Sequence, residues 1–136
     1  MIQGFVCDLG LVTRFAAIDD YAHGLVWNAW HAKVTLVIPT SVLALARAQT
    51  PAGQDAIAVL LGSEITTLDD LDGRRAGEVG ALLAAPDDPV ELSACTETLA
   101  LAHVVALSRE HGWPVISDRL AALHSLDPRV EVKLLR

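Results

Sequence analysis

The feature that most constrains the fold is the stretch Ile2 to Gly10, where the apolar run Phe5-Val6-Cys7 ends on Asp8 and Gly10 soon follows. An apolar run that stops at a polar residue and a glycine is typical of a strand buried on both faces, as in a parallel sheet covered by helices. Asp8 would then lie at the carboxyl edge of the sheet, where ligands bind in open α/β folds. The sequence therefore predicts at Asp8 either a metal or substrate ligand or a cap for the next helix.

Apolar runs and helical patterns alternate along the rest of the chain. Further strands are predicted at Val34–Ile38, Glu64–Leu68, Trp113–Ile116 and Val130–Leu135. Helices are predicted from Asp19 or Asp20 to Ala32, from Thr40 or Ser41 to Gln49, over Asp55–Leu61, from the acidic cluster Asp69, Asp70 and Asp72 to about Ala84, from Val90 or Ser93 to His111, and over Arg119–Ser125, with a turn at Pro86–Pro89. This alternation predicts an α/β fold with three layers, α/β/α, and a mainly parallel central sheet. The last strand alternates apolar and charged residues, which suits a sheet edge.

The size and composition of the chain indicate one folded domain, residues 1–136, because 136 residues suffice for a single sheet-and-helix core. A content of 52% hydrophobic and 20% charged residues excludes a disordered tail. The net charge of −7 opposes non-specific attraction to nucleic acid, so RNA contact would need a local basic patch or a metal ion. A basic protein is the easier partner.

The two cysteines and the N-terminus predict a cytoplasmic protein. Cys7 and Cys95 lie far apart in apolar surroundings and form no CxxC motif, so both are expected to be reduced core thiols. Asp8 interrupts the N-terminal apolar stretch, which therefore does not resemble a signal peptide. Because no apolar run is long enough to span a bilayer, no membrane association is expected.

The first predicted long helix carries two different faces. The face expected to meet the core consists of Ile18, Ala22, Leu25, Val26 and Ala29. The second face carries His23, Trp27, Trp30 and His31. Two tryptophans away from the core either cover a loop or neighbouring helix or form a surface for a partner.

Acidic residues recur at two other places in the pattern. Asp118 repeats the geometry of Asp8, since it follows an apolar run that ends in Ser117 and precedes a helix. The cluster Asp69, Asp70 and Asp72 comes before a predicted helix, where the helix dipole favours negative charge. A helix start is therefore the preferred interpretation of the cluster, with a metal site as the alternative.

Four stretches of the chain share their order and spacing with a known family. They are Phe5-Val6-Cys7-Asp8, then Leu36-Val37-Ile38-Pro39 with Ser41-Val42-Leu43-Ala44, then Ala102-His103-Val104-Val105-Ala106-Leu107, and finally Pro114-Val115-Ile116-Ser117-Asp118. In this order they resemble the PIN domain of the VapC-type toxin ribonucleases, and the resemblance covers nearly the whole chain. It implies a cluster of three or four carboxylates that holds Mg²⁺ or Mn²⁺ and hydrolyses single-stranded RNA. Hard divalent cations prefer such oxygen ligands, and a bound cation can activate water.

The site implied by the resemblance is incomplete. Asp8 matches the family's first acid, and Asp118 matches the carboxylate that closes the fourth strand. The other two expected acids fall at Leu45 and Leu101, which cannot ligate a cation. The resemblance therefore implies Asp8 and Asp118 as metal ligands of a weak Mg²⁺ or Mn²⁺ site at most.

Two residues of the helix predicted from Val90 or Ser93 to His111 bear on this site. Glu97 lies one helical turn before Leu101 on the same helix face, so it is the candidate substitute that would join Asp8 and Asp118 as a catalytic acid. His103 belongs to the resembling motif, and a lone histidine on such a helix is expected to be a hydrogen-bonded structural residue.

Three functions compete on this basis. The preferred one is a catalytically weak or silent PIN-like protein that acts through protein contacts, as a homo-oligomer or with an antitoxin-like protein partner. The alternative is an active Mg²⁺- or Mn²⁺-dependent endoribonuclease, the toxin of a toxin–antitoxin pair, that uses Asp8, Asp118 and Glu97. A nucleotide- or small-anion-binding module of unrelated α/β type is disfavoured because no glycine-rich phosphate loop follows Asp8.

Overall fold

The structure is a computed structural model that describes residues 3–85 and 96–136. Its central sheet contains β1 (Gly4–Cys7), β2 (Thr35–Pro39), β3 (Thr66–Asp69), β4 (Val115–Ser117) and β5 (Val132–Leu134). The strand order is β3-β2-β1-β4-β5, and every neighbouring pair is parallel. β1 thus lies at the centre of the sheet, as its fully apolar run predicts. β5 lies at an edge, which confirms the prediction made from its alternating apolar and charged residues.

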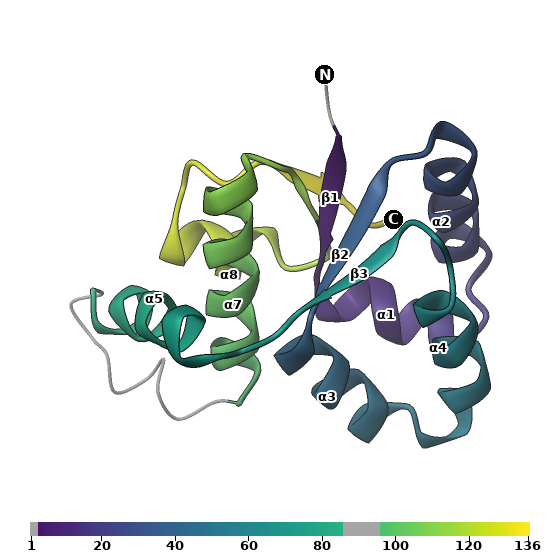
Figure 1. Cartoon of the computed structure of the whole chain (residues 1–136), viewed down its shortest axis with the longest axis horizontal. Coiled ribbons are helices and arrows are strands. Elements are labelled where there is room, and N and C mark those ends of the chain that lie inside the picture. Colours follow the sequence, from purple (N-terminus) through teal and green to yellow (C-terminus); the bar gives the residue numbers. More distant parts are fainter. Residues whose placement is uncertain (1–2, 86–95) are drawn as a thin grey trace.

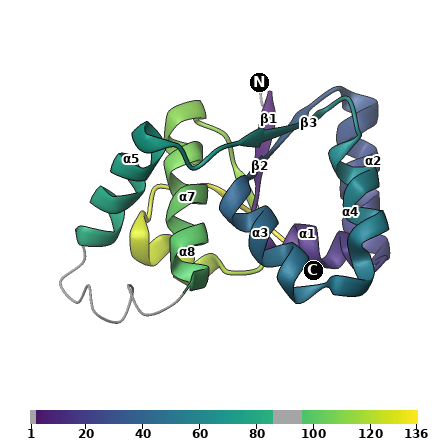
Figure 2. The same cartoon turned by 60° about the horizontal axis from the view of Figure 1, so that its bottom comes forward.

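Helices cover both faces of this sheet. They are α1 (Leu9–Ala16), α2 (Asp20–Ala32), α3 (Thr40–Gln49), the 3₁₀ turn η1 (Pro51–Gly53), α4 (Gln54–Leu61), α5 (Gly73–Ala84), α7 (Thr96–His111) and α8 (Leu120–Leu126). In Figure 1, α1, α2 and α4 lie on one side of the sheet, and α5, α7 and α8 lie on the other. Figure 2 shows α3 at the carboxyl ends of the strands, between these two groups. The predicted three-layer α/β/α fold is confirmed.

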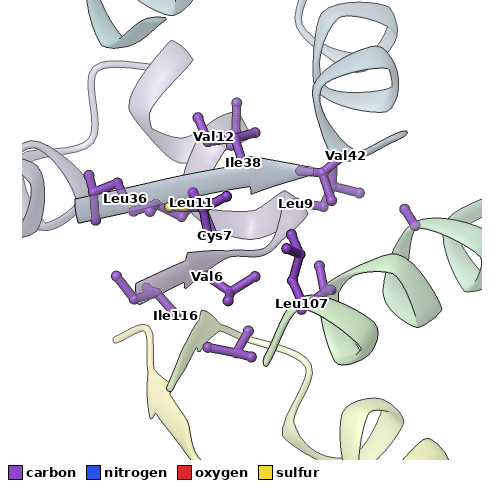
Figure 3. Packing of buried hydrophobic residues seen from close by; sticks show 14 of the residues in the cluster. Val6, Cys7, Leu9, Leu11, Val12, Leu36, Ile38, Val42, Leu107 and Ile116 are labelled. Carbon is purple, nitrogen blue, oxygen red and sulfur yellow. The ribbon is translucent and has the colours of Figure 1, made fainter. Parts of the chain in front are cut away.

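The core forms where β1 and β2 meet α1, α3 and α7. Figure 3 shows apolar side chains from these elements converging around Cys7 and Leu11. Cys7 is completely buried, and burial, followed by the neighbouring charge of Asp8, raises the pKa of its thiol. Cys7 is therefore a free core thiol, as the sequence predicts, whereas Cys95 lies outside the described residues.

One prediction about the core is wrong. Ile18 was expected on the core face of the first long helix, but it is 64% exposed. It sits in the turn between α1 and α2 with a left-handed φ of 61°, so it never joins the helix whose periodicity predicted its burial. Ala22, Val26 and Ala29 are buried as predicted, and Leu25 is half-buried.

Most predicted element boundaries are correct to within two or three residues. The sequence missed α1, because this short helix begins one residue after β1 and its first residues, Leu9 and Gly10, continue the apolar stretch of the strand. Thr40 and Ser41 were predicted as caps of α3, but Pro39 occupies the N-cap position, and no side chain makes a capping hydrogen bond to the N-terminus of this helix. The predicted turn at Pro86–Pro89 and the predicted start, at Val90 or Ser93, of the helix that ends at His111 lie outside the described residues.

None of the helices in the described part of the chain combines the length and apolar character that crossing a membrane requires.

Candidate functional site

Asp8 lies at the carboxyl edge of the sheet, directly after β1, and its side chain is completely buried. It occupies the position before α1, but its carboxylate makes no capping bond to that helix. Instead, the hydroxyl of Ser117 donates to Oδ2 at 2.6 Å. Arg119 donates from Nε to Oδ2 at 3.1 Å and from Nη2 to Oδ1 at 2.6 Å. Both oxygens of Asp8 are thus held by the last residue of β4 and the residue that precedes α8.

Arg119 is the residue at this edge that the sequence pattern did not indicate. Its side chain is mostly buried, and its Nη1 lies 3.6 Å from Oε2 of Glu97. Burial lowers the pKa of Arg119, but its hydrogen bonds to Asp8 and the charges of Asp8, Glu97 and Asp118 outweigh this and raise it. The only sequence signal was a basic residue directly after Asp118, at the edge where acids were expected.

Asp118 and Glu97 reach the same edge by different routes. Asp118 pairs with Arg14 (Nη2 to Oδ2, 3.5 Å) and lies against Gly10, where a Cβ atom would come within 2.6 Å of Oδ1. Glu97, near the start of α7, accepts a hydrogen bond from Nε2 of Gln49 at 3.2 Å. The structure therefore gathers the three predicted acids around Arg119, and their roles as metal ligands or catalytic acids stay predictions.

A shallow hollow of about 320 Å³ opens at this edge, and it is lined by Leu9, Gly10, Thr13, Gln49, Asp118 and Arg119. The two leucines that stand where the family resemblance expects acids belong to the apolar interior: Leu101 is buried, and Leu45 packs against the core. Few side chains around the hollow therefore carry oxygen atoms that could bind a cation.

The donor set as arranged does not suit Mg²⁺ or Mn²⁺. Both cations need several oxygen ligands in near-octahedral geometry, whereas the oxygens of Asp8 are already engaged by Ser117 and Arg119. Within residues 3–85 and 96–136, no group of three or more His, Cys, Asp or Glu side chains is placed to hold a metal ion.

A second polar network lies across the end of β3. Arg75 of α5 is 1% exposed and binds Asp69 through two hydrogen bonds, at 2.9 and 3.0 Å. It also donates to Glu78 at 2.8 Å and to Glu110 at 2.5 Å. A buried guanidinium is tolerated only with such pairing, because an unpaired charge loses its hydration without compensation.

The same network includes the histidine of the resembling motif. His103 is completely buried; its Nε2 lies 2.8 Å from Oδ2 of Asp69, and its Nδ1 lies 2.8 Å from Oγ of Ser41. Burial raises the pKa of Asp69, but the bonds from Arg75 and His103 outweigh it and hold that pKa below its ordinary value. This confirms His103 as a hydrogen-bonded structural residue.

The acidic cluster before α5 is divided between two tasks. Asp72 caps the helix by accepting from the backbone N–H of Arg75 at 2.8 Å, as predicted. Asp69 was also expected at the helix start, but it is the last residue of β3 and pairs with the Arg75 side chain instead. The prediction fails for Asp69 because only the fold brings a buried arginine against it.

The tryptophans of α2 form an exposed aromatic surface together with α4. Trp27 is 60% exposed, and its ring centroid lies 5.4 Å from that of Trp30 and 4.6 Å from that of His31. A hollow of about 450 Å³ runs beside them toward α4, where Val59 is 69% exposed. We call the surface formed by Trp27, Trp30, His31 and Val59 the aromatic surface. The sequence predicts that the tryptophans either cover a loop or neighbouring helix or form a surface for a partner. Because Trp27 is mostly exposed, it does not cover a loop or helix of the described residues.

The comparisons with known proteins agree with this fold. The sequence matches no protein-family model and no curated protein. The central parallel sheet and its two helical layers form a three-layer α/β/α fold that is PIN-like. A solved structure with this fold is the crystal structure of VapBC2 from Rickettsia felis, bound to a DNA fragment from their promoter. The superposition has a TM-score of 0.67 and covers 96% of this chain and 97% of that chain, and the two sequences are 11% identical. A likeness at this identity is one of fold alone.

Proposed function

We propose that this VapC-like PIN domain is catalytically silent and acts through protein contacts at the aromatic surface. The observation that carries the proposal is the engagement of Asp8, whose two carboxylate oxygens are held inside the protein by Arg119 and Ser117. A nuclease of this type would need that carboxylate for its cation. Leu45 and Leu101, which supply no oxygen, support the same conclusion.

The aromatic surface supports the second half of the proposal. Large exposed aromatic side chains that adjoin a hollow are typical of interfaces and are often the residues that contribute most to binding. The exposed charged residues on α2, on α4 and directly after these helices are Asp20, Lys33, Asp55 and Glu64. Three acids and one lysine disfavour a second copy of the same surface and favour a basic partner.

The partner that fits this chemistry is an antitoxin-like protein that presents an amphipathic helix, with an apolar face for the hollow and lysine or arginine on its flanks. A helix bound in a groove places its apolar side chains at successive turns along one face, and the hollow of about 450 Å³ beside the tryptophans, lined by apolar residues of α2 and α4, offers room for such side chains. Self-association through the same surface is the competing outcome.

The test uses a fluorescent amphipathic peptide with leucine and phenylalanine on one face and lysine on its flanks. We expect it to bind the wild type and to bind Trp27→Gln at least tenfold more weakly, a loss of about 1.4 kcal/mol. Leu134→Gln, which removes an exposed apolar side chain on β5, is the matched control and should bind normally. Equal binding by Trp27→Gln and wild type contradicts the proposed surface, and sedimentation velocity separates self-association from peptide binding.

A second candidate function is the Mg²⁺- or Mn²⁺-dependent endoribonuclease. The observation that favours it is the position of Glu97, which shares Arg119 with Asp8 and so lies at the acidic edge as a substitute acid would. Metal-dependent cleavage of single-stranded RNA, or slowed growth on expression that Asp8→Asn abolishes, supports this function and contradicts the silent site. We expect neither.

A further inference from the structure

We infer that the guanidinium of Arg119 is the resident cation of the acidic edge and stands in place of a divalent metal ion. This rests on the proposal of a silent site and extends it by naming the group that closes the site. The inference follows from geometry: Arg119 meets Asp8 at 2.6 and 3.1 Å and Glu97 at 3.6 Å, while Asp118 is its neighbour in the chain.

Burial makes the pair with Asp8 obligatory. Asp8 is fully buried, so its ionised carboxylate cannot be hydrated and must have a compensating charge. Arginine is suited to this position because its planar fork donates to both oxygens of a carboxylate and it stays charged at every pH at which the protein folds. A divalent cation would have to break two charge-assisted hydrogen bonds to reach Asp8.

The turn after β4 sets this arrangement. Ser117 accepts a hydrogen bond from the backbone N–H of Arg119 at 2.8 Å while its hydroxyl donates to Asp8. Arg119 thereby occupies the position before α8 with its side chain directed at Asp8, and Asp118 is directed toward Arg14 and Gly10. Consecutive residues of opposite charge thus face different neighbours, and the basic one takes the position beside the buried acid.

The charge balance of the edge predicts what happens without Arg119. Three carboxylates, those of Asp8, Glu97 and Asp118, face the guanidinium groups of Arg119 and Arg14. Replacing Arg119 by an uncharged residue leaves three acids with one cation, frees Oδ1 of Asp8 and leaves Oδ2 with only its hydrogen bond from Ser117. A site with these available oxygens suits Mn²⁺ far better than the native one.

The test is calorimetric titration of Mn²⁺ into the folded variants in the absence of RNA. We expect Arg119→Gln to bind Mn²⁺ at least tenfold more tightly than wild type and to lose this gain in the double variant Arg119→Gln/Asp8→Asn. Arg14→Gln is the matched control, since Arg14 also pairs with one of the acids but does not touch Asp8, and it should behave as the wild type.

Two results would overturn the inference. One is Mn²⁺ binding by the wild type that is as tight as that of Arg119→Gln and is lost in Asp8→Asn, because Arg119 would then simply move aside. The other is no gain in Arg119→Gln. If that variant does not fold, Arg119→Lys replaces it: a lysine keeps the charge but loses the fork, so at least a threefold gain is expected, and none contradicts the inference. RNA cleavage by wild type refutes the silent function, whereas an absent gain without cleavage refutes this inference alone.

Discussion

The neighbouring arginines at the start of α5 provide a sharp test of how burial decides the value of an ion pair. Both Arg74 and Arg75 contact Glu78 and Glu110. The Arg74 side chain is 60% exposed and that of Arg75 is 1% exposed. The same substitution, arginine to methionine, can therefore be made at adjacent positions that share two partners and differ in solvation.

We expect Arg75→Met to lower the free energy of unfolding by about 3 kcal/mol. Removing one partner of a buried ion pair typically costs about 3–5 kcal/mol, because the remaining charge stays buried without compensation. The lower end applies here because Glu78 and Glu110 are partly exposed and can be rehydrated, which leaves Asp69 as the group that loses its counterion. Arg74→Met should cost less than about 1 kcal/mol, as exposed ion pairs do.

Urea unfolding at neutral pH, followed by tryptophan fluorescence, measures both variants. The denaturant slope m should stay the same, so that the change in midpoint reports stability. The reasoning is refuted if Arg75→Met costs less than about 1 kcal/mol, the exposed-pair value, or if the two variants are equally stable.

Further predictions concern an acidic group and two glycines. Burial raises the pKa of Asp127, but hydrogen bonds from Arg109 and Arg129 outweigh it and hold that pKa well below its ordinary value. The ionised carboxylate therefore stabilises the protein above the unfolded-state pKa of about 4 and loses that contribution as the pH falls. Urea titrations from pH 6 to pH 3 should accordingly show a steeper loss in wild type than in Asp127→Asn, and parallel curves would contradict this. A Cβ at Gly4 would lie 2.5 Å from the ring of Trp113, so Gly4→Ala should cost about 1–3 kcal/mol in the same assay. Apart from its chain neighbours and the backbone of α2 itself, no heavy atom lies within 4 Å of a Cβ at Gly24, so Gly24→Ala should stabilise by about 0.5–1 kcal/mol, and a destabilised variant would show that this helix position is not free.

The sequence predicts those parts of the fold that depend on local pattern. Runs of apolar residues identify the strands, and Asp8 follows β1 at the carboxyl edge as its apolar run predicts. The place of Asp72 at the start of α5 could be predicted because a capping side chain and the backbone N–H that it accepts from lie only three positions apart in the sequence. The exposure of Trp27 follows from its place on the helix wheel.

The pairing of Arg119 with Asp8 in the candidate site was not predictable from local pattern. Arg119 and Asp8 are separated by 111 positions in the chain, and nothing in either segment shows that the guanidinium, rather than the carboxylate of Asp118, faces Asp8. The sequence also cannot distinguish Arg74 from Arg75, because adjacent residues of one type differ in burial only through the turn of the helix against its neighbours. Such contacts arise from tertiary packing.

The central claim is that Arg119 occupies the acidic edge in place of a metal ion. Its most direct test is anomalous diffraction from crystals soaked in MnCl₂. The account predicts that both oxygens of Asp8 keep their bonds to Arg119 and Ser117 and that no anomalous peak lies at coordination distance from Asp8. A manganese peak bound to Asp8, with the Arg119 side chain displaced toward solvent, would contradict the account.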